Sequence, residues 1–511
     1  MSEGSPTLRT RSVLPLRRRS STYTLVLGVA IGMLLAGLVI PLAFGSRDVT
    51  VNGASSPNGI PEATLGGQSG AQATAPGADL SGPNSPGAAR PGTAQSGSSP
   101  SDGTAGRASS PAGSLTASDV GVTPTTINVG VVLVNLAGVQ SAGIGVAGQS
   151  VQDQQQQWQA FIDDINSKGG LLGRRINPFF QLWNPLDDGS SGQAACTHLT
   201  EDNHVFAVLT ASFDGPPVLC VTQQHSTPLI DGDGGSDEDY QSSSGLLWTT
   251  GVGKTRILRI QAAELARLGT LNGKKLGILT SAAYGDDRSV KEGLIPTLNR
   301  LGYNVAHVSD LSADYGTGSS QIPLEVRQMQ AAGVQAIFLA TNNVFSTNFA
   351  QQADAQGFRP MYLGSDFDHS DDDLYVQGMP GGFQGVAITT MRLGEQRIGA
   401  PEPPADAACR QLYESKTGKS VQRGQTAYTT TMFVCDVLDV FSSAVQRAGP
   451  GLTRRKLSAG LAGAGAFSMP FSAGASFGPT KFDAPDASRT MQYNGGCHCW
   501  MPSGNFAPTS Q

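Results

Sequence analysis

The chain has 511 residues, of which 14% are charged, and its formal net charge is −6. Arginine and lysine are scattered along the chain rather than clustered, which gives no electrostatic case for a nucleic-acid partner. A folded part several hundred residues long is too large for one small core and suits two lobes.

Residues 24–44 form a candidate membrane anchor. An uncharged apolar run extends from Thr24 to Phe44. At 1.5 Å per residue it can span a hydrocarbon core of about 30 Å. The preceding tail, residues 1–23, is basic, so it should stay in the cytoplasm while the rest is exported; its arginines are Arg9, Arg11, Arg17, Arg18 and Arg19. A cleaved signal peptide is the alternative, but the run exceeds the usual apolar core of such peptides.

Residues 45–118 form the next segment, and they are rich in glycine, serine, alanine and proline. They contain almost no large apolar side chains, so they cannot bury enough surface to offset the entropy of ordering. We expect a disordered linker that separates the folded part from the membrane.

The folded part begins with a predicted strand, helix and second strand. The run Ile127 to Val134 is apolar and rich in β-branched residues, as in a buried parallel strand. After Ser150, a candidate N-cap, Trp158, Phe161, Ile162 and Ile165 recur at helical spacing. Gly169-Gly170 can end this helix, and a second strand follows near Ile176 to Leu182. The pattern predicts a βαβ unit with a parallel sheet.

The end of the helix in this unit carries a distinctive sequence motif. It contains Asp164-Ile165-Asn166 and then Gly169-Gly170-Leu171-Leu172-Gly173-Arg174-Arg175-Ile176. The segment resembles the end of the first helix in type I periplasmic solute-binding proteins, the branched-chain amino-acid (Leu/Ile/Val)-binding family of ABC transporters. In that family an asparagine, paired glycines, a third glycine and a basic pair stand at these spacings.

The resemblance implies an α/β, two-lobed type I periplasmic binding protein fold, with two Rossmann-like lobes and three hinge crossovers. Residues 119–511 would form it, with lobe 1 at about 119–248 and 388–470, and lobe 2 at about 249–387 and 471–511. Crossings are expected near Leu247–Thr250, Ala387–Thr390 and Met469–Ser472, with a last strand pair around Phe477–Phe482 and Thr490–Tyr493. Further strand-like runs support the alternation: 205–209, 228–230, 275–280, 304–308, 336–340, 360–363 and 385–389.

All six cysteines lie in the exported part, where an even number favours disulfides. As in related binding proteins, Cys196–Cys220 would tie a helix to the helix after the next strand, and Cys409–Cys435 would similarly join two neighbouring helices. Cys497 and Cys499 remain, as a CxC disulfide or part of a metal site. No second Cys/His pair stands at zinc-like spacing, so we assign no metal. No cysteine stands directly after the apolar run, so we do not expect the lipoprotein anchor that is common in the family.

Candidate ligand contacts are sought in the loops that follow strands, because parallel sheets bind ligands beyond the carboxyl ends of their strands. The loop with Ser212 and Phe213 resembles the family loop that holds a ligand carboxylate, although the usual glycine is replaced by Thr210 or Ala211. The loop with Tyr284 resembles the family's "YG" loop, whose tyrosine covers the ligand from lobe 2.

Two acidic loops also follow predicted strands. One contains Asp233 and Gly234, and the other runs from Asp366 to Asp373. Solvated rims are the common role of such loops, and the EF-hand pattern of a calcium site is absent. The alternative is that Asp233 or Asp366 receives a ligand ammonium group.

The sequence thus predicts an extracytoplasmic solute-binding protein, anchored in a bacterial plasma membrane, that passes a small polar ligand to an ABC permease. The ligand would be an amino acid or a related amine or amide. The alternative is a tethered sensor of the same fold that signals through a partner protein. A third class, an enzyme or a wall-associated structural protein, would merely reuse the fold. No hydrolase, zinc-protease or P-loop motif is complete, so no cofactor or catalysis is expected.

Overall fold

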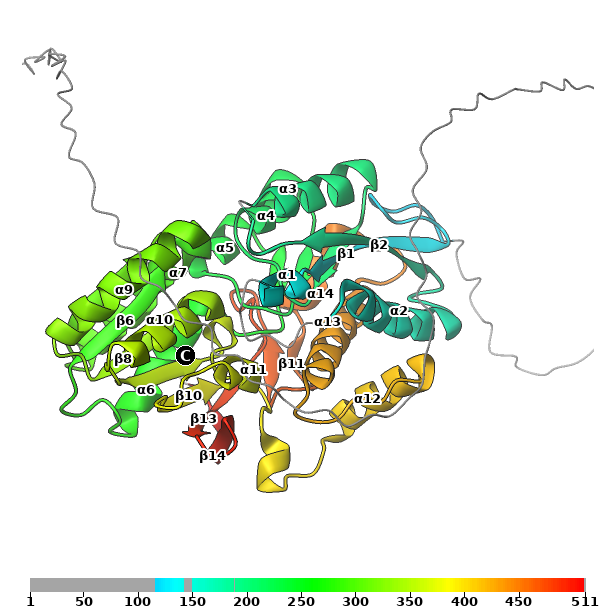
Figure 1. Cartoon of the computed structure of the whole chain (residues 1–511). Helices are drawn as coiled ribbons and strands as arrows, with labels where there is room; N and C mark the ends of the chain where they lie inside the picture. Colours follow the sequence, from blue (N-terminus) through cyan, green and yellow to red (C-terminus); the bar gives the residue numbers. More distant parts are fainter. Residues whose placement is uncertain (1–114, 142–148, 188, 510–511) are drawn as a thin grey trace, which may run out of the picture. The chain divides into compact units, whose positions relative to one another are not determined.

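A computed structural model describes residues 115–141, 149–187 and 189–509 (Figure 1). The predicted cytoplasmic tail, the membrane anchor and nearly all of the linker lie outside these described residues. Among the helices that are described, none combines the length and the apolar character needed to cross a membrane.

Five parallel strands form the first sheet, in the order β2-β1-β3-β4-β5. The predicted βαβ unit is confirmed, because β1 and β2 pair in parallel along their whole length. Strand β1 is buried almost throughout, as expected for an apolar run inside a parallel sheet. The bounds are β1 Thr126–Val134, β2 Arg175–Trp183, β3 Ala207–Thr210, β4 Leu229–Asp231 and β5 Leu247–Thr249.

The predicted helix between β1 and β2 is α2 (Val151–Ser167), which follows the short helix α1 (Leu136–Ser141), and its ends are as predicted. The Ser150 side chain accepts a hydrogen bond from the backbone N–H of Asp153. After the helix, Gly170 has a φ of 72°, and a Cβ there would come within 2.0 Å of the carbonyl oxygen of Arg174. Glycine is therefore required where this chain turns from the helix into β2.

Seven strands form the second sheet, in the order β14-β13-β10-β9-β8-β6-β7. Strands β6 to β10 run parallel, whereas β13 is antiparallel to both β10 and β14. Figure 1 shows β13 and β14, in red, beside β10, which precedes them by about a hundred residues. The bounds are β6 Leu276–Ser281, β7 Val305–Leu311, β8 Ala336–Ala340, β9 Met361–Ser365, β10 Gly385–Thr389, β13 Ala487–Asn494 and β14 Cys499–Pro508.

Helices alternate with these strands. Helices α1 to α5 and α12 to α14 belong to the first lobe, and α6 to α11 belong to the second. Besides α2, the described α-helices are α1 Leu136–Ser141, α3 Ser190–Thr197, α4 Pro216–Leu219, α5 Asp237–Ser242, α6 Lys254–Arg267, α7 Asp286–Ser289, α8 Ile295–Arg300, α9 Tyr315–Ala331, α10 Asn343–Ala355, α11 Asp373–Gln377, α12 Pro404–Thr417, α13 Thr426–Ala448 and α14 Arg454–Ala462. Single 3-10 or π turns are η1 His198–Asp202, η2 Cys220–Gln224, η3 Ala283–Gly285, η4 Val290–Leu294, η5 Phe367–His369 and η6 Glu395–Ile398.

The chain passes between the two sheets after β5, after β10 and again before β13. Isolated bridges tie these connections together, joining Thr249 to Asp483 and Met391 to Ser472. Three extended connections that contact one another are the hinge of a two-lobed molecule.

The expected last strand pair is wrong. Strand β12 (Ala475–Phe477) pairs with β11 (Gly465–Phe467) in a small sheet of its own, and β13 pairs with β10 and β14. The ring of Phe477 lies 5.1 Å from that of Trp248 at the end of the first sheet. Aromatic packing therefore keeps β12 beside β5, and the strand-like composition of this segment did not reveal its partner.

Three disulfides join the cysteines. Cys196–Cys220 and Cys409–Cys435 are confirmed, the first linking α3 to the turn after α4 and the second linking α12 to α13. Of the two alternatives for the remaining pair, the structure has the disulfide Cys497–Cys499.

Candidate functional site

A cavity of about 670 Å³ is walled by both lobes. In the first lobe its lining follows β1, β2, β3 and β4 and includes parts of α2 and α13. In the second lobe it follows β6, β7, β8 and β9. The carboxyl ends of two parallel sheets therefore face one space, which is the arrangement in which α/β proteins bind ligands.

Aromatic side chains make up much of this lining. They come from both lobes and are Trp158, Trp183, Tyr284, Tyr315, Phe345, Tyr375 and Phe433. Smaller apolar side chains add to them, among them Val134, Leu136, Val139 and Val344. A surface of this kind favours a ligand with an apolar or aromatic body.

The charged side chains of the lining are acidic, with His369 as the single exception that can carry positive charge. They are Asp187, Asp214, Asp233, Asp314 and Asp372, and among the described residues no lysine or arginine is part of the lining. Three of these carboxylates accept backbone N–H groups near helix starts. Such hydrogen bonds do not neutralise a carboxylate, so the cavity attracts cations.

An ion pair crosses the cavity from lobe to lobe. Asp233, after β4, and His369, after β9, approach to 2.7 Å between Oδ1 and Nε2. Burial by itself would lower the pKa of His369, but the charge of Asp233 and the hydrogen bond to it raise that pKa to about 10. The pKa of Asp233 is lowered in spite of burial, because His369 and the Ser212 side chain stabilise its charged form. The imidazole is therefore protonated and holds the lobes together at neutral pH.

Tyr284 is the second contact across the cavity. It follows β6 in lobe 2, and its hydroxyl donates to the carbonyl oxygen of Pro185 in lobe 1 at 2.9 Å. Its ring lies 6.4 Å from that of Trp183 and against Gly215, where a Cβ would come within 2.5 Å of the tyrosine ring. The backbone of Tyr284 is left-handed, with a φ of 50°, and His369 has a φ of 58°. Strained non-glycine residues of this kind concentrate at functional sites.

A lysine forms ion pairs with both lobes. Lys254, at the start of α6, lies 3.3 Å from Asp214 of lobe 1 and 3.3 Å from Asp286 of lobe 2. Its side chain is only 5% exposed, so its charge is shared between two carboxylates rather than offered to a ligand. Farther out, Arg288 pairs with Glu238 across the lobes.

Three of the six predicted ligand contacts line the cavity: Ser212, Asp233 and Tyr284. The other three do not, and each has a structural explanation. Phe213 is buried, with its ring 5.5 Å from that of Trp183. At Gly234 a Cβ would come within 1.8 Å of the carbonyl oxygen of Val252. The Asp366 carboxylate accepts the backbone N–H and the hydroxyl of Thr390, so it secures the crossing after β10.

Several lining residues were not identified from sequence. Trp158 was assigned only to a core, His369 was one letter of an acidic loop, and Trp183 lay at the end of β2. The available signal was position at the carboxyl end of a strand for Trp183 and in the loop after a strand for His369. Gln157 had no such sequence signal, because its side chain on α2 contacts α13, which is far away in the sequence.

Solved structures share this architecture. A fatty acid ABC transporter substrate-binding protein from Thermomonospora curvata superposes with a TM-score of 0.56 at 18% identity, covering 78% of this chain and 96% of that one. A solute-binding protein of an ABC transporter from Rhodopseudomonas palustris BisB5, in complex with 3,4-dihydroxybenzoic acid, has a TM-score of 0.56 and 16% identity, covering 76% of this chain and 98% of that one. A branched-chain amino acid ABC transporter protein from Thermus thermophilus with bound valine has a TM-score of 0.57 and 12% identity, covering 76% of this chain and 97% of that one.

Sequence comparison is consistent with this likeness. No curated protein matches the chain. The family model described as "periplasmic binding protein" matches residues 136–496, which is most of the folded part and includes strands of both sheets. The resemblance noted around Asn166 and Gly169-Gly170 is thereby confirmed, and the two-lobed α/β architecture is the type I periplasmic binding fold. The chain belongs to the periplasmic binding protein family.

Proposed function

We propose that the protein is an extracytoplasmic solute-binding protein that captures an amine-bearing small molecule with an apolar body and passes it to an ABC permease. The observation that carries this proposal is the cavity between the lobes, whose lining is aromatic and acidic without lysine or arginine. Family membership supports capture by lobe closure, with binding rather than bond chemistry as the output.

The charges favour a cationic group over an anionic one. Asp314 and Asp372 form no ion pair with a described lysine or arginine, so a ligand ammonium would be attracted to them, and aromatic faces such as Trp158 and Tyr315 would attract it further. Burial raises the pKa of Asp372, so a ligand cation would also stabilise the ionised form of this carboxyl group.

A buried acceptor supports the same ligand class. The side-chain nitrogen of Gln157 donates to Ala427, Thr430 and Thr431, which fixes the orientation of the amide. Its oxygen is buried and accepts no hydrogen bond from the described residues. A ligand N–H would satisfy this oxygen, whereas a ligand carboxylate would be repelled by it.

The loop around Ser212 offers little to an α-carboxylate. The backbone N–H of Ser212 donates to the Thr210 hydroxyl at 3.1 Å, and the Ser212 side chain stabilises the charged form of Asp233. The donors that would hold a carboxylate are therefore engaged within the protein. An amine or amide is accordingly favoured over an amino acid, the other member of the predicted ligand class.

Ser212, Asp233 and Tyr284 remain our proposed ligand contacts. The membrane tether, residues 24–44, also remains a proposal. Its test is fractionation of the full-length protein, which should sediment with membranes and retain its original N-terminus. A mature protein that begins near Ser46 would contradict the anchor.

The ligand is identified by mass spectrometry of small molecules that co-purify with the protein. Calorimetry then compares the ligand with its N-acetylated form, which should bind at least ten times more weakly if the ammonium is recognised. Tyr284→Ala should cost about 2–4 kcal/mol of affinity, because it removes a buried aromatic contact. Tyr284→Phe removes only the bond to Pro185 and should cost about 1 kcal/mol.

Ser212→Ala should likewise cost about 1 kcal/mol, because the hydroxyl supports Asp233 and lines the cavity. Unchanged affinity in both Tyr284→Ala and Ser212→Ala would show that the ligand binds elsewhere. Equal affinity for the amine and its acetylated form would show that the ligand class is wrong.

A further inference from the structure

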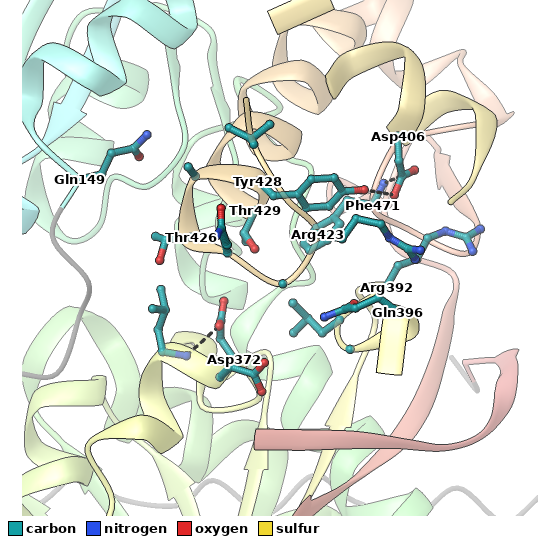
Figure 2. Close-up of a pocket in the computed structure, with 18 of the residues that line it drawn as sticks. Gln149, Asp372, Arg392, Gln396, Asp406, Arg423, Thr426, Tyr428, Thr429 and Phe471 are labelled. Atoms are coloured by element: carbon teal, nitrogen blue, oxygen red, sulfur yellow. Dashed lines mark hydrogen bonds between the residues drawn. The ribbon is translucent and has the colours of Figure 1, made fainter. Parts of the chain in front are cut away.

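A second cavity lies at the hinge. Its volume is about 530 Å³, and Figure 2 shows most of the side chains that line it. The walls include the start of α13 in lobe 1, the crossing after β10 and the start of α11 in lobe 2. Residues at the start of α2, on α12 and in the segment 419–425, together with Phe471, complete the lining. Asp372, Leu374, Thr426 and Thr429 line both this cavity and the cleft, so the two are neighbours. We call this second cavity the hinge pocket.

The floor of the hinge pocket is the hinge itself. The backbone N–H of Arg392 donates to the carbonyl oxygen of Phe471 at 3.0 Å, and Met391 bridges Ser472. These contacts join the second crossing of the chain to the segment before the third. A molecule bound here would touch both lobes and two of the connections between them.

One end of the hinge pocket carries an excess of positive charge. The buried Glu395 carboxylate is approached by Arg392 at 3.5 Å, Arg423 at 3.9 Å and Arg489 at 3.4 Å. Three guanidinium groups thus share one carboxylate. Two of them, Arg392 and Arg423, line the pocket, and Figure 2 shows both on the side away from Asp372.

Most of the other charges around the pocket are already paired. Asp153 pairs with Lys419 at 2.6 Å, and Asp373 pairs with Arg397. Asp406 accepts hydrogen bonds from the Tyr428 hydroxyl and the Phe471 backbone N–H. Burial raises the pKa of Asp406, which reduces the negative charge that it sets against the arginines.

The backbone adds to the positive end. Helix α13 begins at Thr426 without a side-chain cap, and its first residues, Thr426 to Thr429, line the hinge pocket. The N–H groups of a helix start attract anions, although here the effect only supplements the two guanidinium groups. The rings of Tyr428 and Phe471, 6.4 Å apart, supply an apolar wall beside them.

We propose that the hinge pocket is a second ligand site, which takes a small organic carboxylate with an apolar or aromatic body. Its carboxylate pairs with Arg392 and Arg423, as guanidinium groups suit planar oxyanions, and its body lies against Tyr428 and Phe471. Because the pocket is built from both lobes and the hinge, the occupied pocket stabilises one lobe arrangement. It thereby changes the affinity of the cleft for its own ligand.

The test uses the purified full-length protein and sodium benzoate as the probe, without any cleft ligand. Calorimetry should show benzoate binding that weakens with added salt, and at least tenfold weaker binding of benzamide, its neutral counterpart. Arg423→Gln should weaken benzoate binding at least tenfold, and Arg423→Lys, which keeps the charge, should weaken it less. Arg359→Gln, at an exposed arginine of lobe 2, is the matched control and should leave it unchanged.

Arg423 also donates to the carbonyl oxygen of Ala400, so circular dichroism must show that each variant is folded. If Arg423→Gln does not fold, the comparison of benzoate with benzamide and the salt dependence decide the matter on the unaltered protein. Absent benzoate binding, equal binding of benzoate and benzamide, or equal affinity in Arg423→Gln and Arg359→Gln would each overturn the proposal. None of these outcomes bears on the amine site of the cleft, which is measured separately.

Discussion

Replacement of His369 by asparagine should open the cleft. His369 has a left-handed backbone, and asparagine tolerates that conformation better than most residues. The substitution therefore removes the positive charge with little added strain. It leaves Asp233 facing the cavity without the partner that approaches it to 2.7 Å.

The free-energy cost of losing this ion pair can be estimated from the solvent exposure of its two side chains. The side chain of His369 is 31% exposed and that of Asp233 is 16% exposed. Loss of one partner from a fully buried pair costs about 3–5 kcal/mol, whereas an exposed pair contributes at most about 1 kcal/mol. Solvent screening at this intermediate exposure reduces the expected cost to about 2 kcal/mol. The equilibrium between closed and open lobes would then shift about 30-fold toward the open form.

Hydrogen exchange of the full-length protein measures this shift without a known ligand. Backbone N–H groups in the loops after β4 and β9 should exchange about 30-fold faster in His369→Asn. Asp233→Asn should have a similar effect, and the double variant should be little worse than either single variant. Asp354→Asn, which removes the exposed pair with Arg359, is the control and should change little. Fully additive effects of the two single variants would refute direct coupling of these residues.

Three further predictions follow from the same structure. The contribution of protonated His369 to lobe closure should be complete below pH 6.5, its ordinary pKa, and should be lost as the pH rises toward 10. The melting temperature of the wild type should therefore fall more steeply over this range than that of His369→Asn. Parallel curves for the two proteins would contradict the ion pair of His369 with Asp233. Combined Cys196→Ser and Cys220→Ser, which opens a loop with a sequence separation of 24, should lower the free energy of unfolding by about 3 kcal/mol without weakening ligand binding, as urea titration and calorimetry can show. Asp366→Asn should lower stability to urea, because its carboxylate holds Thr390, but should not alter the preference for an amine; a selective loss of amine binding would restore Asp366 as a ligand contact.

The sequence alone determined the elements whose signals are local. The helix from Val151 to Ser167 has its apolar stripe, its serine cap and its glycine end within one continuous segment. The strands Ala336–Ala340 and Gly385–Thr389 are apolar runs bounded by turns, and the structure has them as predicted. The loops of Ser212 and Tyr284 could be placed at the cleft because any residue directly after a parallel strand lies at the ligand-binding edge of the sheet.

Only the tertiary structure decided which partners meet across the hinge. Asp233 pairs with His369 more than a hundred residues later, and Arg392 and Arg423 share Glu395 with Arg489. Neither grouping has a sequence signal, because each depends on how two sheets are set against each other by three connections. The same holds for Asp366, whose acidic loop suggested a ligand but whose carboxylate is used by Thr390. Local composition fixes a strand and the loop after it, whereas the charge balance of a cleft depends on side chains that only folding brings together.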